Sequence, residues 1–194
     1  MEKSQIQKAV EILKADGVIA YPTETVYGLG ANIFSPIAVK KVFRLKGRNF
    51  NQPLSVAIAN FQTLKTLAKI SPKEEKLLHR LLPGPVTVIL PKKKIVPNLV
   101  TAGQDTVGIR FPDHPLALAI INQAGFPITA TSANLSGKKE ITNPRHLQIK
   151  VDFVVKNGCR FCQPSTIVDL SQKRILRAGA EAAKVKEILK GFGK

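Results

Sequence analysis

Hydroxyl and carboxylate side chains gather directly after the first segment that predicts a strand, residues 18–21. Thr23, Glu24 and Thr25 occupy this position, ahead of two glycines. Open α/β sheets bind ligands in loops at strand ends, and a simple turn would not require these three side chains together. We therefore expect this loop to contact a ligand, with ordinary turn chemistry as the alternative.

Three cations stand within five positions where a predicted helix ends, at Arg44, Lys46 and Arg48. Lys46 and Arg48 flank a glycine, and this spacing lets two long side chains reach one phosphate. Compensation of the helix dipole explains the same cations equally well. The segment is a candidate phosphate site, and cations that face water in a cavity are expected to contribute little to folding stability.

A third polar cluster, with Ser132 and Asn134, follows another predicted strand. Hydroxyl and amide groups at a strand end suit a nucleotide or a sugar, although these residue types also favour plain turns. Ser165 with Thr166, and Arg177 further along, form two weaker clusters that indicate little by themselves.

The sequence lacks the motifs of several common enzyme classes. No Gly-x-Ser-x-Gly elbow occurs, no histidine stands beside a candidate nucleophile, and no Gly-x-x-x-x-Gly-Lys-Ser/Thr loop is present. Cys159 and Cys162 form a single Cys-x-x-Cys pair, whereas a structural zinc needs four ligands. We expect these cysteines to be incidental, and we expect no metal ligand from the protein.

Helices and strands must hold these clusters in place. Apolar periodicity and capping residues predict helices near residues 4–17, 35–46, 71–82, 116–123 and 180–189. Short apolar segments predict strands at residues 18–21, 54–59, 86–90, 107–111, 127–131, 153–155 and 165–170. Because several strands follow one another without a helix, we predict an α/β fold with α+β character. Its mixed parallel and antiparallel sheet would be flanked by helices, in a single domain over residues 1–194.

The charge balance predicts a polyanionic partner. Lys and Arg number 30 against 13 Asp and Glu, so the formal net charge is +17. A lysine-rich surface without a specific partner is the alternative.

No stretch approaches the roughly 18–20 apolar residues that cross a bilayer, and the N-terminal segment has no signal-peptide core. We therefore expect a cytoplasmic protein with no membrane partner, and the two cysteines agree with a reducing compartment.

Seven motifs in a fixed order make the chain resemble the YrdC/TsaC family, the L-threonylcarbamoyladenylate synthases. They extend over about residues 17–179 and read YPTETVYGLGAN, LKGR followed by PL, LLPGPVTVIL, VGIRFP, TSANLSG, PSTIVDL and ILRAG. Each motif is short, but seven in order make the resemblance highly specific.

The resemblance implies a single YrdC-like domain with a twisted mixed sheet and a large basic cavity. It implies formation of L-threonylcarbamoyl-AMP and diphosphate from L-threonine, bicarbonate or CO₂, and ATP. This reaction serves the threonylcarbamoyladenosine modification of tRNA. Mg²⁺, brought with ATP, is the implied cofactor, and a tRNA-modifying transferase complex is the implied partner.

The same resemblance implies roles for individual residues. Lys46 and Arg48 are implied to be catalytic, by stabilising charge on the phosphoryl oxygens. The implied ATP-binding residues are Arg44, Lys46, Arg48, Ser132, Asn134 and Arg177. The implied L-threonine-binding residues are Thr23, Thr25, Tyr27, Arg110, Ser165 and Thr166.

The chain departs from many relatives at two positions. Ala57 stands where many carry a histidine, and Glu140-Ile141-Thr142 stands where many carry Ser-Pro-Thr. These departures concern individual ATP contacts and leave the motifs intact. No additional C-terminal domain is expected, because the chain ends soon after the ILRAG motif.

A non-catalytic RNA-binding module with a basic surface is the alternative function. The net charge favours it, but aromatic residues make up only 6% of the chain and tryptophan is absent, so an RRM-type stacking surface is not indicated. Formation of diphosphate that depends on threonine and bicarbonate would exclude this alternative. Apart from catalysis, we expect weak, salt-sensitive binding to tRNA or double-stranded RNA.

Overall fold

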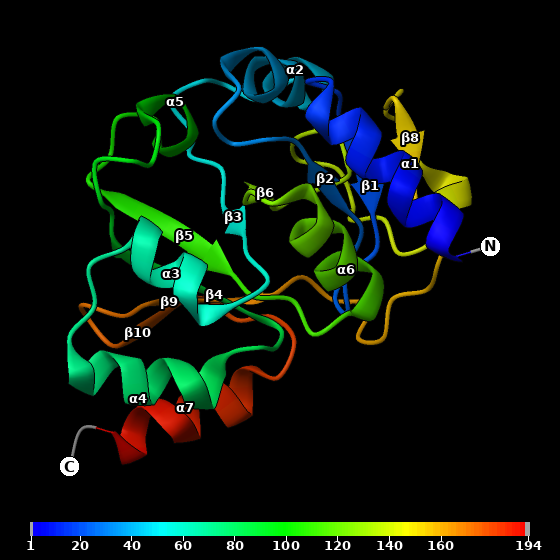
Figure 1. The fold of residues 1–194 in the computed structure, drawn as a ribbon. Helices are drawn as coiled ribbons and strands as arrows, with labels where there is room; N and C mark the ends of the chain where they lie inside the picture. The colour runs from blue at the N-terminus through cyan, green and yellow to red at the C-terminus, as the bar shows by residue number, and fades with distance from the viewer. Residues whose placement is uncertain (1, 193–194) are drawn as a thin grey trace.

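The computed structural model describes residues 2–192, which form helices packed around two β-sheets (Figure 1). In chain order the elements are α1 (Glu2–Lys14), β1 (Ile19–Tyr21), β2 (Gly28–Gly30), α2 (Pro36–Lys46), β3 (Val56–Ala57), α3 (Phe61–Leu67), α4 (Pro72–Leu81), β4 (Val86–Pro91), α5 (Asn98–Thr101), β5 (Thr106–Arg110), α6 (Pro115–Ala124), β6 (Ile128–Thr129), β7 (Thr131–Ser132), η1 (Pro144–His146), β8 (Phe153–Val154), β9 (Thr166–Asp169), β10 (Arg174–Arg177) and α7 (Ala182–Gly191). Over the described residues, no helix has the length and apolar character needed to span a bilayer.

The strands divide into a four-stranded sheet, in the order β7-β2-β1-β8, and a six-stranded sheet, in the order β10-β9-β4-β5-β3-β6. Both sheets are mixed. Strand β1 is antiparallel to β2 and parallel to β8, and β4 is antiparallel to β5 and parallel to β9. The predicted mixed α/β class is confirmed, although the strands are shared between two sheets where one was expected.

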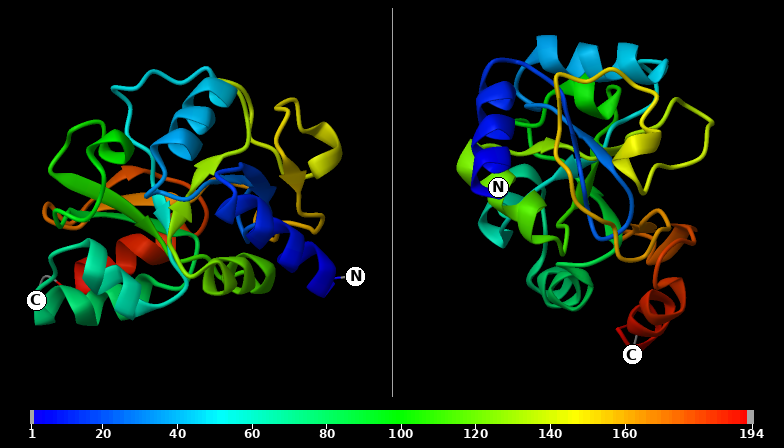
Figure 2. Two further views of the ribbon diagram at one scale, coloured as in Figure 1. Left: turned by 45° about the horizontal axis from the view of Figure 1, so that its top comes forward. Right: turned by 90° about the vertical axis from the view of Figure 1, so that its right-hand side faces the viewer.

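Strand β1 is buried on both faces, and this explains its continuous apolar sequence. Side chains alternate along a strand, so Ala20 joins a large apolar cluster while Ile19 and Tyr21 join a smaller one. The smaller cluster lies against α1 and α6, which run side by side (Figure 2). The large cluster contains Leu29 from the four-stranded sheet and Ile109 from the six-stranded sheet, so the two sheets share a core.

Helix α2 ends where its capping residues predict, and this end positions the cationic segment. Ser35 accepts a hydrogen bond from the backbone N–H of Ala38 at 3.1 Å, which caps the first turn. Gly47 adopts the left-handed conformation, with φ +58°, and ends the helix. The chain therefore turns sharply between Lys46, which is buried, and Arg48, which lies in the following loop.

Several element boundaries differ from the sequence predictions. Helix α1 begins at Glu2, so Ser4 lies inside the helix and does not cap it. Only Val56–Ala57 of the predicted strand 54–59 pairs as a strand. Helix α3 was not predicted, although Asn60 caps it by accepting from the N–H of Thr63 at 2.7 Å. The single-domain organisation of residues 1–194 stays a prediction.

Gly179 generates a prediction about stability, because backbone atoms approach it closely. A Cβ at this position would lie 2.7 Å from the carbonyl oxygen of Ser165 and would also clash with the carbonyl oxygen of Pro164. These carbonyl groups are backbone and cannot rotate away as a side chain would. We expect Gly179→Ala to lower the free energy of unfolding by about 1–3 kcal/mol, measured by denaturant titration.

Gly191→Ala is the matched control, because nothing lies within 4 Å of a Cβ built at that glycine. Equal midpoints for the two variants would contradict the prediction.

Candidate functional site

Two cavities lie next to each other and share two lining residues, Arg48 and Ser132. The first cavity, of about 310 Å³, is lined by residues of both sheets. The second, of about 430 Å³, is lined by the loop after α2 and by the segment that follows β7. A ligand that extends from one cavity to the other would pass Arg48.

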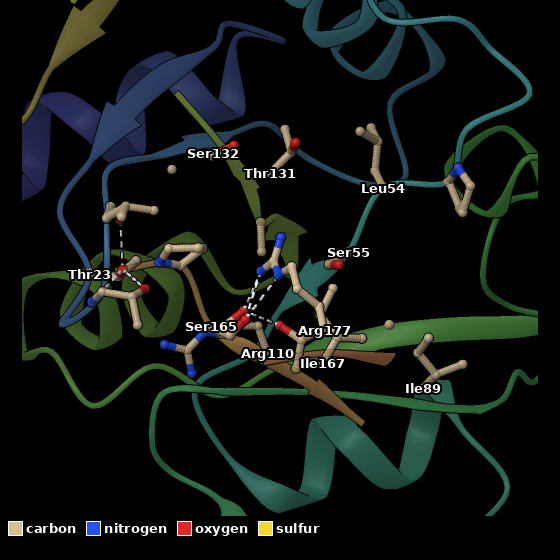
Figure 3. A pocket seen from close by; sticks show the side chains of 18 of the residues that line it. Thr23, Leu54, Ser55, Ile89, Arg110, Thr131, Ser132, Ser165, Ile167 and Arg177 are labelled. Carbon is tan, nitrogen blue, oxygen red and sulfur yellow. Dashed lines mark hydrogen bonds between the residues drawn. The ribbon is translucent and has the colours of Figure 1, made fainter. Parts of the chain in front are cut away.

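Polar and apolar side chains both line the first cavity. In Figure 3, Thr23, Arg110 and Ser165 lie away from Leu54 and Ile89, and the part of the cavity around these three polar residues is called its polar end. A small ligand with both charged and apolar groups matches this lining.

A buried ion pair forms the base of the polar end. The guanidinium of Arg110 donates to Oε1 of Glu24 at 2.6 Å, and the two side chains are only 5% and 1% exposed. Arg110 also donates to the carbonyl oxygen of Val86 at 3.3 Å. Five N–H groups are available on a guanidinium, so Arg110 keeps donors for an anionic group in the cavity.

Two threonine hydroxyls at the same end have a fixed hydrogen-bond direction. Thr23 donates its proton to the carbonyl oxygen of Val26 at 2.7 Å. In its 2.8 Å contact with Thr25, Thr23 must therefore accept, and Thr25 donates. The oxygen of Thr25 keeps its lone pairs, so it can accept from a ligand's amino group.

Ser165 is held between two strands at the edge of the first cavity. Its hydroxyl lies 2.8 Å from the hydroxyl of Thr87. Arg177 donates to the backbone oxygen of Ser165 at 2.7 Å and to its hydroxyl at 3.3 Å (Figure 3). Partial burial lowers the pKa of the Arg177 guanidinium, and the nearby carboxylate of Glu140 opposes this shift.

Lys46 anchors the wall of the second cavity. Lys46 is only 2% exposed. Its ammonium donates hydrogen bonds to the carbonyl oxygens of Ser132 and Asn134. It also donates to Oδ1 of the Asn134 side chain at 3.2 Å. Burial is the main cause that lowers the pKa of Lys46 to about 8, and the charge of Arg48 lowers it further. Lys46 thus contributes its charge to the cavity while its protons hold the wall.

Arg48 holds the loop that separates the cavities. Its Nε donates to the carbonyl oxygen of Gln52 at 3.2 Å, and a terminal nitrogen donates to that of Pro53 at 2.8 Å. These hydrogen bonds predict a larger contribution of Arg48 to the fold than its sequence context did. Removing its side chain would leave two backbone carbonyls without these donors.

The structure brings most of the predicted site residues to the two cavities. The second cavity is lined by Lys46, Arg48, Ser132 and Asn134, and the first is lined by Thr23, Thr25, Tyr27, Arg48, Arg110, Ser132, Ser165 and Arg177.

Two predicted site residues lie away from both cavities. Arg44 is exposed on α2 and lines neither of them. It precedes Lys46 by two positions, so it points to a different side of the helix. Thr166 is fully buried, where its hydroxyl donates to the carbonyl oxygen of Ala180 at 2.8 Å. Thr166 therefore supports the chain near Gly179 and does not face the first cavity.

Two further side chains line a cavity but use their polar atoms on the protein. The hydroxyl of Tyr27 lies 2.6 Å from the carbonyl oxygen of Asn157 and accepts from the N–H of the same residue at 2.9 Å. The amide of Asn134 accepts from Lys46 and donates to the carbonyl oxygen of Lys138. Both side chains therefore shape the wall of the site, and the amide nitrogen of Asn134 keeps a second N–H beyond the one given to Lys138.

Sequence reasoning placed Glu24 in the ligand loop and Glu140 among the departures from relatives, but it gave neither side chain an individual role. Glu24 carried a signal, because a carboxylate between two threonines is unusual in a simple turn. Its ion pair connects residues 86 positions apart, and no local pattern predicts such a partner. Glu140 stands out only as a departure from relatives, yet its side chain lines the second cavity.

The chemistry of the donor groups suits a cation that arrives with a bound polyanion. Within residues 2–192, no three His, Cys, Asp or Glu side chains gather closely enough to hold a metal ion. The second cavity offers Glu140 as a carboxylate beside groups that attract phosphate. A metal ion shared between one protein carboxylate and the phosphate oxygens of a ligand fits the residues of the second cavity.

The two cysteines lie outside both cavities. Cys159 is half-buried, and burial is the main cause that raises the pKa of its thiol to about 11, whereas Cys162 is exposed.

Comparison with known proteins identifies the family of this chain. A family model for Sua5, YciO and YrdC, described as telomere recombination, matches residues 11–179. The chain belongs to the Sua5/YciO/YrdC family. Two relatives are threonylcarbamoyl-AMP synthases. That of Pyrococcus abyssi is 42% identical over 178 residues, which cover 89% of this chain and 52% of the relative. That of Bacillus subtilis is 49% identical over 150 residues, which cover 76% and 43%.

A solved structure of the family shares the fold. The crystal structure of P. abyssi Sua5 complexed with L-threonine superposes with a TM-score of 0.91 at 39% identity, covering 97% of this chain and 58% of that one. This chain thus spans about half the length of the family members P. abyssi Sua5 and the B. subtilis synthase.

Lys46 generates a prediction about pH. A pKa of about 8 means that the ammonium is charged at pH 7 and mostly neutral at pH 9. A polyphosphate prefers the charged form, so diphosphate affinity should be highest below pH 8 and fall about tenfold by pH 9. Calorimetric titration with diphosphate at pH 7 and at pH 9 measures this change in affinity. Lys46→Met should abolish the part of the change that comes from titration of the protein.

Lys138→Met provides the matched control, because Lys138 is an exposed cation on the same cavity. It should keep the pH dependence of the original protein, and this comparison cancels the titration of diphosphate itself. The assignment fails if Lys46→Met and the original protein lose affinity equally between pH 7 and pH 9.

Proposed function

We propose that this chain forms L-threonylcarbamoyl-AMP and diphosphate from L-threonine, bicarbonate or CO₂, and ATP. The observation that carries the proposal is the pair of cavities that share Arg48. One has groups for an amino acid, and the other has groups for a polyphosphate. The threonylcarbamoyl-AMP synthases among the relatives support the same reaction.

L-Threonine would occupy the polar end of the first cavity. The free donors of Arg110 suit its carboxylate, and the oxygen of Thr25 suits its amino group. P. abyssi Sua5, whose structure contains L-threonine, supports this placement. Glu24 balances the charge of Arg110, so the site carries no uncompensated buried cation when it is empty.

The reaction needs two bond-forming steps and no enzyme nucleophile. The neutral amine of threonine attacks the carbon of CO₂ and loses a proton, which gives a carbamate. A carbamate oxygen then attacks the α-phosphorus of ATP, and the bond to the diphosphate oxygen breaks. Such chemistry is accelerated mainly by positioning the reactants and by stabilising charge on phosphoryl oxygens.

Arg48 is the residue best placed for the second step. It lines both cavities, and in the proposed reaction it would stand between the carbamate in one cavity and the phosphates in the other. Lys46 adds positive charge and holds the Ser132 segment as a rigid wall. Mg²⁺, when bound with ATP, would neutralise charge on the phosphate oxygens.

The proposal places the reaction in the cytoplasm, as a supplier of threonylcarbamoyl-AMP to a transferase complex that modifies tRNA. An RNA-binding module remains the second candidate, because the net charge of +17 exceeds what the two cavities require. Labelled bicarbonate distinguishes the two functions. Label should enter a nucleotide product only when threonine and ATP are both present, and absence of this product would reject the proposal.

Arg48→Ala should nearly abolish product formation. Loss of one charged contact to a transition state costs about 2–4 kcal/mol, which corresponds to a factor of about 10²–10³ in rate. Loss of the hydrogen bonds to Gln52 and Pro53 should also lower folding stability, by about 1–2 kcal/mol. Product formation is measured with labelled bicarbonate, and stability is measured by denaturant titration.

Arg80→Ala serves as the control, since Arg80 is exposed on α4 and lines neither cavity. It should retain full turnover. If Arg48→Ala retained most of its turnover, the role of Arg48 would be wrong even with the reaction established.

A further inference from the structure

We propose that Glu140 is the protein's ligand to the Mg²⁺ ion that accompanies ATP in the second cavity. The inference rests on the proposed function, because it requires a triphosphate in that cavity. It assigns a role to a residue at which this chain departs from many relatives, and it differs from the expectation, drawn from the sequence, that no protein side chain contacts the metal.

Glu140 is a carboxylate in a cavity built mainly from phosphate-attracting groups. Lys46, Arg48 and Lys138 line the same cavity, together with the hydroxyls of Ser132 and Ser136. The side chain is half-buried, and no ion pair within 4.0 Å involves it in the part of the chain that the structure describes. Glu140 is therefore near these cations without being neutralised by direct contact.

The backbone on both sides of Glu140 is tied down. The carbonyl oxygen of Ile141 accepts from the N–H of Tyr27 at 2.8 Å. The carbonyl oxygen of Lys138 accepts from the amide of Asn134, which is itself held by Lys46. These bonds tie the segment that carries Glu140 to Tyr27, just before β2, and to Asn134, just after β7, so the backbone on each side of the carboxylate is held in place.

A bare triphosphate in this cavity would meet the negative charge of Glu140. Like charges a few ångströms apart repel unless a cation lies between them. Mg²⁺ prefers oxygen ligands and is commonly held by one or two carboxylates together with substrate phosphates and water. No group of three His, Cys, Asp or Glu side chains that could hold a metal occurs among residues 2–192, so a Mg²⁺ ion bound by Glu140 would also draw ligands from the phosphates and from water.

The competing explanation is that Glu140 only weakens the attraction of the cations for phosphate. Its charge does oppose the burial effect on the pKa of both Lys46 and Arg177. The two explanations predict opposite responses to Mg²⁺. A metal ligand helps ATP to bind when Mg²⁺ is present, whereas a purely repulsive charge hinders ATP under all conditions.

The test measures ATP affinity of the full chain by calorimetry, with Mg²⁺ and with a chelator, for the original protein and Glu140→Gln. Without Mg²⁺, Glu140→Gln should bind ATP about threefold to tenfold more tightly, because the repulsion is gone. With Mg²⁺, it should bind at least about tenfold more weakly, because the ligand is gone. Electron paramagnetic resonance of Mn²⁺ with ATP should show the same loss of metal binding in the ternary complex.

Glu187→Gln is the matched control, because it makes the same charge change at an exposed position on α7. It should leave both affinities and the Mn²⁺ signal unchanged. Tighter binding of ATP by Glu140→Gln in both conditions, or no change in either, would overturn the role of Glu140 alone. Failure of the original protein to bind ATP with Mg²⁺ would overturn the proposed function and this inference with it.

Discussion

The ion pair between Arg110 and Glu24 joins the two sheets at the point where the first cavity forms. Glu24 lies in the loop between β1 and β2 of the four-stranded sheet, and Arg110 ends β5 of the six-stranded sheet. Both charges are almost completely removed from water, so neither is tolerated there without the other. Displacing one sheet relative to the other would leave a buried charge without its partner. The relative placement of the sheets and the charge of the cavity are thus coupled.

The same coupling occurs at the second cavity. Lys46 is buried at the end of α2, where its ammonium donates hydrogen bonds to the backbone carbonyl oxygens of Ser132 and Asn134. Its hydrogen bonds connect a helix to the segment after β7, and its charge contributes to the attraction for phosphate. Arg48 similarly holds the loop at Gln52 and Pro53 while it lines both cavities. In this chain the groups that attract the ligand also shape the walls around it.

Much of the architecture follows from local sequence patterns. Ser35 and Gly47 mark the two ends of α2, as their residue types predict. At the start of α4, Ser71 and Glu74 have the spacing of a capping box, and the structure contains that capping box. Strands buried on both faces are readable as apolar runs, and their succession predicts a mixed sheet. The division into two sheets was not predictable, because short apolar segments specify that a strand is buried and do not specify its neighbour. Helix α3 was missed even though Asn60 caps it, since only two of its side chains are buried.

For the site, the sequence by itself determined which segments carry the chemistry, because hydroxyls, cations and a carboxylate cluster at element ends. Tertiary structure decided which side chain of each segment faces a ligand. Ser165 and Thr166 are neighbours in sequence, but only Ser165 lines the cavity. Arg44 and Lys46 are both at the end of α2, but the helical twist separates their directions. Periodicity in a sequence reveals that two faces differ, whereas only packing against distant segments decides which face meets the cavity.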